Sequence, residues 1–199
     1  MKTLTPEKFN LKLPNAELTY FPNFFTKKNA DIFFQQLRTE IPWRQDNITV
    51  FGKTHKQPRL TALYSQNSKT YTYSGITMEP LLFSTTLKTI LTKIVEETAH
   101  TFTTVLLNLY RDGSDSNGWH ADDEKELGIN PVIASISLGS ERFFHFKHKK
   151  QKELRYNLLL KHGSLLIMEG EMQHYWLHQI PKSKQVIGER INLTFRTIN

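Results

Sequence analysis

The stretch Arg190-Ile191-Asn192-Leu193-Thr194-Phe195-Arg196 decides the fold, because it alternates strictly between polar and apolar residues. Successive side chains of a β-strand point to opposite faces, so Ile191, Leu193 and Phe195 share one face. The two arginines share the other face with an asparagine and a threonine. This pattern predicts a strand of an antiparallel sheet that has one face on a hydrophobic core.

Other short strand-like segments precede this one throughout the second half of the chain. They are predicted at residues 103–111, 132–138, 142–147, 156–160, 164–168 and 174–179, with the last strand at 190–198. Turn signals such as Asp112-Gly113, Gly139-Ser140 and His162-Gly163 separate them. Seven short strands at this spacing predict an all-β sandwich, barrel or jelly roll for residues 101–199.

The first half of the chain has helical periodicity in two places. Thr26 is a suitable N-cap for a helix that runs to about residue 41, and a second helix is predicted over residues 79–100. Residues 48–73 between them indicate strands and turns. We therefore predict an α+β protein with a single domain over residues 1–199, in which N-terminal helices pack on a β-core.

The composition limits the possible partners and sites. The chain has 199 residues, 26 lysines and arginines against 19 acids, a net charge of +7 and no cysteine. A basic surplus favours acidic partners such as nucleic acid. Without cysteine, any metal must be held by histidine and carboxylate. No signal peptide or membrane span is evident, so we expect a soluble intracellular monomer that is cytoplasmic in a bacterium or nuclear in a eukaryote, with no membrane partner.

The segment Trp119-His120-Ala121-Asp122-Asp123-Glu124 carries the first candidate site. In an extended chain His120 and Asp122 point the same way, and one further histidine would complete the 2-His-1-carboxylate face of non-haem Fe(II) oxygenases. The alternative is a solvated acidic loop in which His-x-Asp occurs by chance. The histidines that follow in the chain are His145, His148, His162, His174 and His178.

The polar face of the last strand suggests a ligand for its two arginines. The Cα atoms of Arg190 and Arg196 are about 20 Å apart in an extended strand, so side chains that lean together would hold the two ends of a short dicarboxylate. Asn108 and Tyr110 also share one strand face and offer an amide and a phenol. The alternative for both segments is an ordinary strand with its polar face in water.

Together these motifs resemble the AlkB-type Fe(II)/2-oxoglutarate-dependent dioxygenases. The resemblance rests on Asn108-x-Tyr110, His120-x-Asp122, His178 and Arg190-x-Asn192-x-x-x-Arg196, in that order. It implies a double-stranded β-helix, or jelly roll. It implies that His120, Asp122 and His178 are the catalytic iron ligands, with His174 as the fallback for His178. It implies that 2-oxoglutarate is bound by Asn108, Tyr110, Arg190, Asn192 and Arg196.

The N-terminal half is similar to the substrate lid of the branch of this family that repairs nucleic acid. The similar segments are residues 50–53, 58–59 and 71–75. The resemblance implies that Phe51 fills the gap left by a flipped base and that Tyr71 and Tyr73 line the base pocket. It also implies that Asp123 and Glu124 attract a cationic methylated base, with Arg59 paired to one of these acids.

The activity implied is oxidative demethylation of bases such as 1-methyladenine and 3-methylcytosine in DNA, including duplex DNA, with RNA left open. Fe(II) would be the cofactor, 2-oxoglutarate and O₂ would be consumed as co-substrates, and formaldehyde, succinate and CO₂ would be released. Two other functions are a 2-oxoglutarate-dependent hydroxylase or demethylase of a protein or small molecule, and a nucleic-acid-binding relative without activity. The lid and the basic surplus argue against a protein or small-molecule substrate. The complete set of metal ligands and arginines argues against a relative without activity.

A basic run over residues 142–152 is the predicted contact with phosphates. Arg142 is its first candidate because it matches a family position. The other members are Lys147, His148, Lys149, Lys150 and Lys152, and further candidates are Lys27, Lys28, Lys53 and Lys56.

Overall fold

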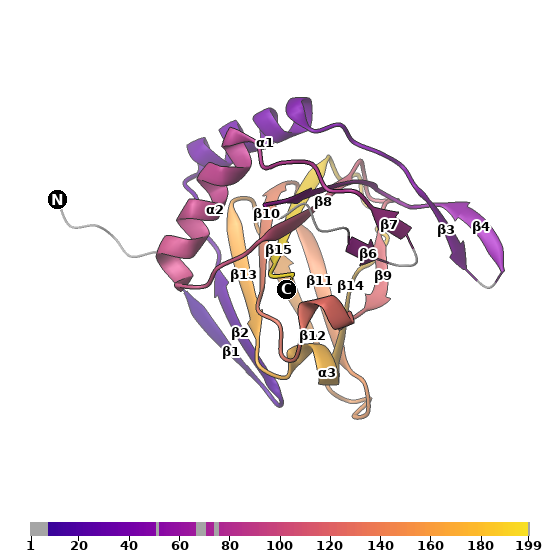
Figure 1. Cartoon of the computed structure of the whole chain (residues 1–199). Coiled ribbons are helices and arrows are strands. Elements are labelled where there is room, and N and C mark those ends of the chain that lie inside the picture. Colours follow the sequence, from indigo (N-terminus) through magenta and orange to yellow (C-terminus); the bar gives the residue numbers. More distant parts are fainter. Residues whose placement is uncertain (1–7, 51, 67–70, 74–75, 199) are drawn as a thin grey trace.

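A computed structural model describes residues 8–50, 52–66, 71–73 and 76–198 (Figure 1). The helices are α1 (Lys27–Glu40), α2 (Thr85–Thr98) and α3 (Met172–Tyr175), with the 3₁₀-helix η1 (Lys125–Leu127). The strands are β1 (Phe9–Leu13), β2 (Ala16–Phe21), β3 (Asn47–Val50), β4 (Lys53–Lys56), β5 (Leu60–Ser65), β6 (Tyr71–Tyr73), β7 (Ile76–Met78), β8 (Thr104–Tyr110), β9 (Asn117–His120), β10 (Ile133–Gly139), β11 (Arg142–His148), β12 (Arg155–Leu160), β13 (Ser164–Glu169), β14 (Trp176–Ile180) and β15 (Arg190–Arg196).

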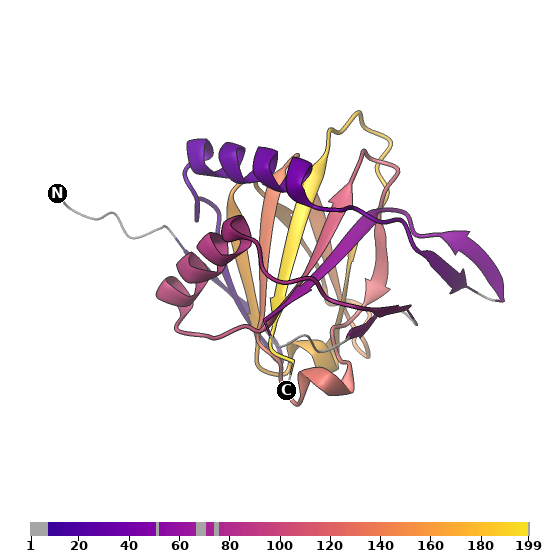
Figure 2. The same cartoon turned by 45° about the horizontal axis from the view of Figure 1, so that its top comes forward.

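Two antiparallel sheets form the β-core. The larger sheet has the order β1-β2-β13-β10-β15-β8-β5, and the smaller has the order β12-β11-β14-β9. The helices α1 and α2 cover the outer face of the larger sheet (Figure 2). The predicted jelly-roll core with N-terminal helices is confirmed.

The larger sheet is buried on both faces, so β15 has hydrophobic core on one side and the candidate site on the other. Ile191, Leu193 and Phe195 belong to the cluster that also contains Leu37 of α1 and Ile90 of α2. A second cluster fills the space between the two sheets and includes Tyr110, Phe146 and Trp176. The strand that we expected to be half-buried is therefore buried at every position.

Local signals account for where the helices begin and end. The Thr26 hydroxyl caps α1 by accepting from the Asn29 N–H at 3.3 Å. The second helix begins at Thr85 rather than at residue 79, because Ser84 caps it and the preceding segment pairs through the bridge Tyr64↔Leu81. None of the helices in the described part of the chain is long and apolar enough to cross a membrane.

Four other elements, β1, β2, β9 and α3, were not predicted. The N-terminal hairpin of β1 and β2 extends the larger sheet, and β9 adds an edge to the smaller one. The short helix α3 occupies the start of the segment 174–179, so that strand begins at Trp176. In the predicted lid, β3 pairs with β4 and β6 pairs with β7, as two-stranded hairpins.

Candidate metal and co-substrate site

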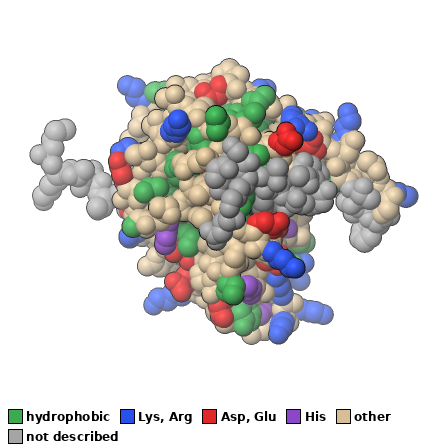
Figure 3. Space-filling model, in the orientation of Figure 1, with side chains coloured by type: hydrophobic (Ala, Val, Ile, Leu, Met, Phe, Trp, Pro, Cys, Tyr) green, Lys and Arg blue, Asp and Glu red, His purple; other side chains and the backbone are tan. Residues whose placement is uncertain are grey.

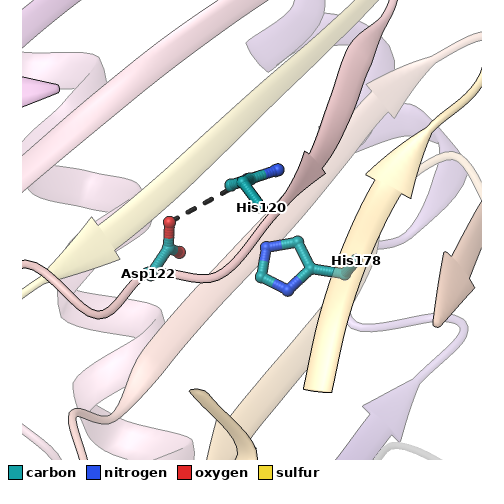
Figure 4. A group of neighbouring side chains, drawn as sticks. All are labelled: His120, Asp122 and His178. Atoms are coloured by element: carbon teal, nitrogen blue, oxygen red, sulfur yellow. Dashed lines mark ion pairs between the residues drawn. The ribbon is translucent and has the colours of Figure 1, made fainter. Parts of the chain in front are cut away.

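The smaller sheet brings the three candidate metal ligands together. His120 ends β9, Asp122 follows two residues later, and His178 lies opposite His120 on β14. The possible ligand atoms of all three residues lie within 4.8 Å of one another, and the imidazole centroids are 4.3 Å apart (Figure 4). Asp122 Oδ1 is 4.0 Å from His120 Nε2. Among the described residues no other histidines and acids converge in this way, and His174 is not part of the group.

The donor set suits a divalent iron ion. Two imidazoles and one carboxylate are the ligands of the facial triad that leaves coordination positions open. Burial and the neighbouring His120 lower the pKa of His178 to about 3, so its imidazole is neutral and able to ligate. His178 Nδ1 is buried and has no hydrogen-bond partner within the part of the chain that the structure describes.

Arg196 keeps Asp122 ionised. Its Nη2 donates to Asp122 Oδ1 at 2.9 Å, and both side chains are buried. Burial alone would raise the pKa of Asp122, but the electrostatic interaction with the Arg196 cation, together with those with His178 and His120, outweighs it and lowers the pKa to about 2. The carboxylate is therefore negative when it meets a metal ion.

Gln173 on α3 fixes the backbone beside the metal site, and no sequence pattern points to this role. Its buried Oε1 accepts from the Asp122 N–H at 2.9 Å. Its carbonyl accepts from Lys149 Nζ at 2.9 Å, and the same ammonium lies 3.3 Å from Asp123 Oδ2. The segment that carries Asp122 is thus attached to both α3 and the end of β11.

The predicted co-substrate residues line one cavity between the two sheets. In the register of β15 and β8, Arg190 lies opposite Tyr110 and Asn192 opposite Asn108. The cavity is lined by these four residues, by the three metal-ligand candidates and by Ser135, Thr194 and Arg196, among others. The structure therefore brings the predicted 2-oxoglutarate residues and the predicted metal ligands to the same cavity.

Arg190 is the residue in this cavity best suited to hold a carboxylate. It is buried, its Nη2 donates to Ser137 Oγ at 2.9 Å, and its Nε and Nη1 have no hydrogen-bond partner in the described residues. Burial lowers its pKa to about 10, so it remains a cation at neutral pH. A buried guanidinium with two unused donors fits a carboxylate ligand.

The remaining co-substrate candidates already have partners. Asn192 Nδ2 donates to Ser135 Oγ and to the Ile136 carbonyl, and Asn108 Oδ1 accepts from Arg59 Nε at 2.7 Å. Arg196 is the arginine at the metal end of the cavity, where it contacts Asp122. The two arginines therefore differ in their partners: Arg190 donates to a neutral hydroxyl, whereas Arg196 is already in an ion pair.

The predicted substrate residues are only partly described. Phe51 lies outside the described residues, and of Tyr71 and Tyr73 the structure describes the backbone of β6. Arg59 is buried and also donates to the Ser116 carbonyl at 3.1 Å, while its ion pair with Asp123 or Glu124 stays a prediction. Asp123 is exposed and Glu124 half-buried, directly after the metal-ligand candidate Asp122.

The structure corrects the prediction that Arg142 contacts a phosphate. Arg142 is 3% exposed and donates to the carbonyls of Asp112, Asp115 and Pro181. A guanidinium enclosed by three carbonyls joins loops and is not available to a phosphate. The sequence suggested a phosphate contact because the charge of Arg142 is visible in the sequence and its burial is not.

The rest of the basic run has several roles. His148 is buried and accepts from the N–H groups of Lys150 and Gln151, so it closes the turn between β11 and β12. Lys150 and Lys152 are exposed on this turn. Figure 3 shows lysine and arginine side chains around the lower end of the molecule, where Figure 1 places the turn. These lysines remain the predicted phosphate contacts.

A family model described as the 2OG-Fe(II) oxygenase superfamily matches residues 17–196. The chain is 43% identical over 192 residues to the human "Alpha-ketoglutarate-dependent dioxygenase alkB homolog 3", which covers 92% of this chain. The chain spans 66% of that human protein, slightly less than two thirds of its length. It is 40% identical over 184 residues to the mouse "DNA oxidative demethylase ALKBH2", covering 87% of this chain and 77% of the mouse protein.

A solved structure, "The structure of OsALKBH1", has the same fold with a TM-score of 0.65. It is 17% identical in sequence and covers 96% of this chain and 100% of its own. At that identity the likeness shows the arrangement of the sheets.

Proposed function

Because the chain belongs to the 2OG-Fe(II) oxygenase superfamily, we propose that it is an oxidative demethylase of N-alkylated nucleobases. In this function it is a dioxygenase that uses Fe(II) and 2-oxoglutarate. The observation that carries the proposal is the group His120, Asp122 and His178 in a cavity that also contains Arg190. Its relatives named as DNA oxidative demethylases support the substrate class.

His120, Asp122 and His178 would hold the iron. When bound with 2-oxoglutarate and O₂, it supplies the oxidation that hydroxylates the N-methyl group, while 2-oxoglutarate becomes succinate and CO₂. The hydroxymethyl product then loses formaldehyde and leaves the repaired base. All three ligands come from one chain, so we propose that a monomer suffices.

Arg190 would bind a carboxylate of 2-oxoglutarate through its unused Nε and Nη1. Tyr110 lies beside it, with the guanidinium carbon 5.2 Å from the ring centroid, and limits how Arg190 is able to turn. Asn108, Asn192 and Arg196 would complete the polar wall of the cavity. The co-substrate would then lie between Arg190 and the metal ligands.

The damaged base would enter from the side of the two hairpins. We propose that Tyr71 and Tyr73 stack on the base and that Phe51 fills the gap that the flipped base leaves in the nucleic acid. We also propose that Asp123 and Glu124 attract the base and that Arg59 pairs with one of these two acids. A methylated adenine or cytosine of this kind is a cation. The cationic base would compete with Lys149 for the carboxylate of Asp123, because Lys149 Nζ lies 3.3 Å from Asp123 Oδ2.

The test is formaldehyde release from oligonucleotides that contain 1-methyladenine or 3-methylcytosine. We expect release that requires both Fe(II) and 2-oxoglutarate, and that His120→Ala and Asp122→Ala each abolish. His174→Ala is the matched control, because His174 is a nearby histidine outside the ligand group. No release from any methylated DNA or RNA, in single- or double-stranded form, would overturn the proposal.

A further inference from the structure

Trp119 precedes the metal-ligand candidate His120 and has no role in the site described above. It is 36% exposed. Adjacent residues of a strand point to opposite faces, so the indole lies on the outer face of β9 while His120 faces the cavity. A half-exposed aromatic beside an active site is therefore available for a ligand.

The indole lines a second pocket, between the outer side of β9 and the base of the β3–β4 hairpin. Its volume is about 500 Å³ including the open mouth. Besides Trp119 and its strand neighbours, the lining includes Ile48, Gln57, Pro58 and Arg59. The lining thus combines an aromatic ring with an isoleucine and a proline, apolar groups that a flat ring is able to contact.

Gln57 gives this pocket a polar group without a partner. It is 2% exposed, and its Oε1 has no hydrogen-bond partner among the described residues. A buried acceptor without a donor costs free energy unless a ligand provides one. A carboxamide places a donor next to an acceptor, which matches the N6 and N7 edge of adenine.

A cation lies next to the same indole. Lys147 Nζ is 4.3 Å from the centroid of the Trp119 ring. Lys147 and Trp119 lie on one face of the smaller sheet, because both alternate with inward-facing residues along β11 and β9. These three groups match the three parts of a nucleotide. The aromatic ring stacks on a base, the amide bonds the edge of the base, and the ammonium group binds the phosphate.

We infer that this pocket binds one unpaired nucleotide next to the base that is demethylated. The base stacks on Trp119, its edge pairs with Gln57, and its phosphate binds Lys147. This inference rests on the proposed function. The nucleotide is a neighbour and not the target, because this pocket contains only His120 of the three metal-ligand candidates, whereas all three line the cavity that contains Arg190.

The experiment measures binding of two single-stranded oligonucleotides that each contain one 1-methyladenine, under anaerobic conditions and with Fe(II) and 2-oxoglutarate present. One has adenines on both sides of the lesion, and the other has abasic sites there. We expect the wild-type enzyme to bind the first about tenfold more tightly, because the abasic oligonucleotide lacks the base that stacks on Trp119.

Trp119→Ala should remove this preference and bind both oligonucleotides alike, while Trp119→Phe should keep part of it. Gln57→Met keeps the shape of the side chain and should weaken the preference for adenine over thymine at the flanking positions. Phe143→Ala is the matched control, because Phe143 is also exposed on the outer face of the smaller sheet, at 54%, and does not line the pocket.

Two results would overturn the inference. One is a wild-type enzyme that binds both oligonucleotides equally, and the other is a Trp119→Ala variant that keeps the full preference. Either result leaves the proposed function intact if the wild-type enzyme still releases formaldehyde. Absence of turnover with every methylated oligonucleotide would instead overturn the proposed function itself.

Discussion

Arg196 donates to Asp122 at 2.9 Å inside the protein, and so joins the last strand of the larger sheet to the candidate metal site beside the smaller one. Breaking a buried ion pair leaves an uncompensated charge. Arg196→Met should therefore lower the free energy of unfolding of the metal-free protein by about 3–5 kcal/mol, measured by urea denaturation.

The control for that variant is Arg44→Met. Arg44 lies 3.0 Å from Asp46 but is largely exposed, and removal of an exposed pair should cost less than about 1 kcal/mol. Equal losses in the two variants would show that the Arg196–Asp122 pair contributes no more than a surface pair.

Metal affinity should depend on three residues and not on a nearby histidine. We expect His178→Ala and Asp122→Asn to abolish Mn²⁺ binding measured by calorimetry, because each removes one of three ligands. His174→Ala should bind Mn²⁺ like the wild type. Loss of binding in His174→Ala with retention in His178→Ala would reverse the assignment.

Arg190 should control affinity for 2-oxoglutarate. Arg190→Met removes a buried cation with unused donors, and removal of one partner from a charged hydrogen-bonded pair of this type costs about 2–5 kcal/mol of binding. The dissociation constant should rise by at least about 30-fold at saturating Mn²⁺. Mn²⁺ binding itself should not change. An unchanged dissociation constant for 2-oxoglutarate would place its carboxylate elsewhere.

Arg142 and the lysines of the β11–β12 turn should behave differently. Arg142→Met should lower the free energy of unfolding by about 2 kcal/mol or more, because three carbonyls would be left without their charged donor. The combined change Lys150→Gln and Lys152→Gln should leave stability nearly unchanged. The same double variant should bind single-stranded oligonucleotides with a weaker salt dependence. The slope of the logarithm of the binding constant against the logarithm of the salt concentration should fall in magnitude by about 0.7 for each phosphate that the variant no longer neutralises.

A salt slope that is the same in the lysine variant and in the wild type would remove this turn from the nucleic-acid interface. A reduced slope in Arg142→Met, at full stability, would restore Arg142 as a phosphate contact.

Asp115 should contribute to stability above about pH 4. Burial tends to raise its pKa, but hydrogen bonds from Arg111 at 2.8 Å outweigh burial and hold the pKa below its ordinary value of 3.8. Because the native pKa is the lower one, the stabilisation is fully present above 3.8 and is lost as pH falls through the native value.

The check is to compare Asp115→Asn with the wild type in urea at several pH values. The variant should be less stable at pH 7, and the difference should shrink below pH 4. A difference that stays constant between pH 7 and pH 3 would contradict the assigned ionisation.

The sequence predicted the β-core, and strand alternation predicted that His120 and Asp122 point the same way and that Arg190 and Arg196 share one strand face. That the two pairs meet at one site was implied by the family resemblance. His178 required the family resemblance, since five histidines follow Asp122 and alternation does not select among them. Gln173 was not predictable, because α3 is a single turn with no periodicity. Arg142 was assigned wrongly, because a sequence shows a charge but not the carbonyls that surround it.

The strand β15 lies between β10 and β8 in the larger sheet, and this position determines how its amide protons exchange with solvent. Its backbone is paired on both sides and its seven residues are all buried, so its amide protons should exchange with deuterium only through global unfolding. Since Arg190 and Arg196 belong to this strand, a dicarboxylate bound to them should slow exchange across the whole larger sheet. Release of succinate should then proceed without local melting of the strand.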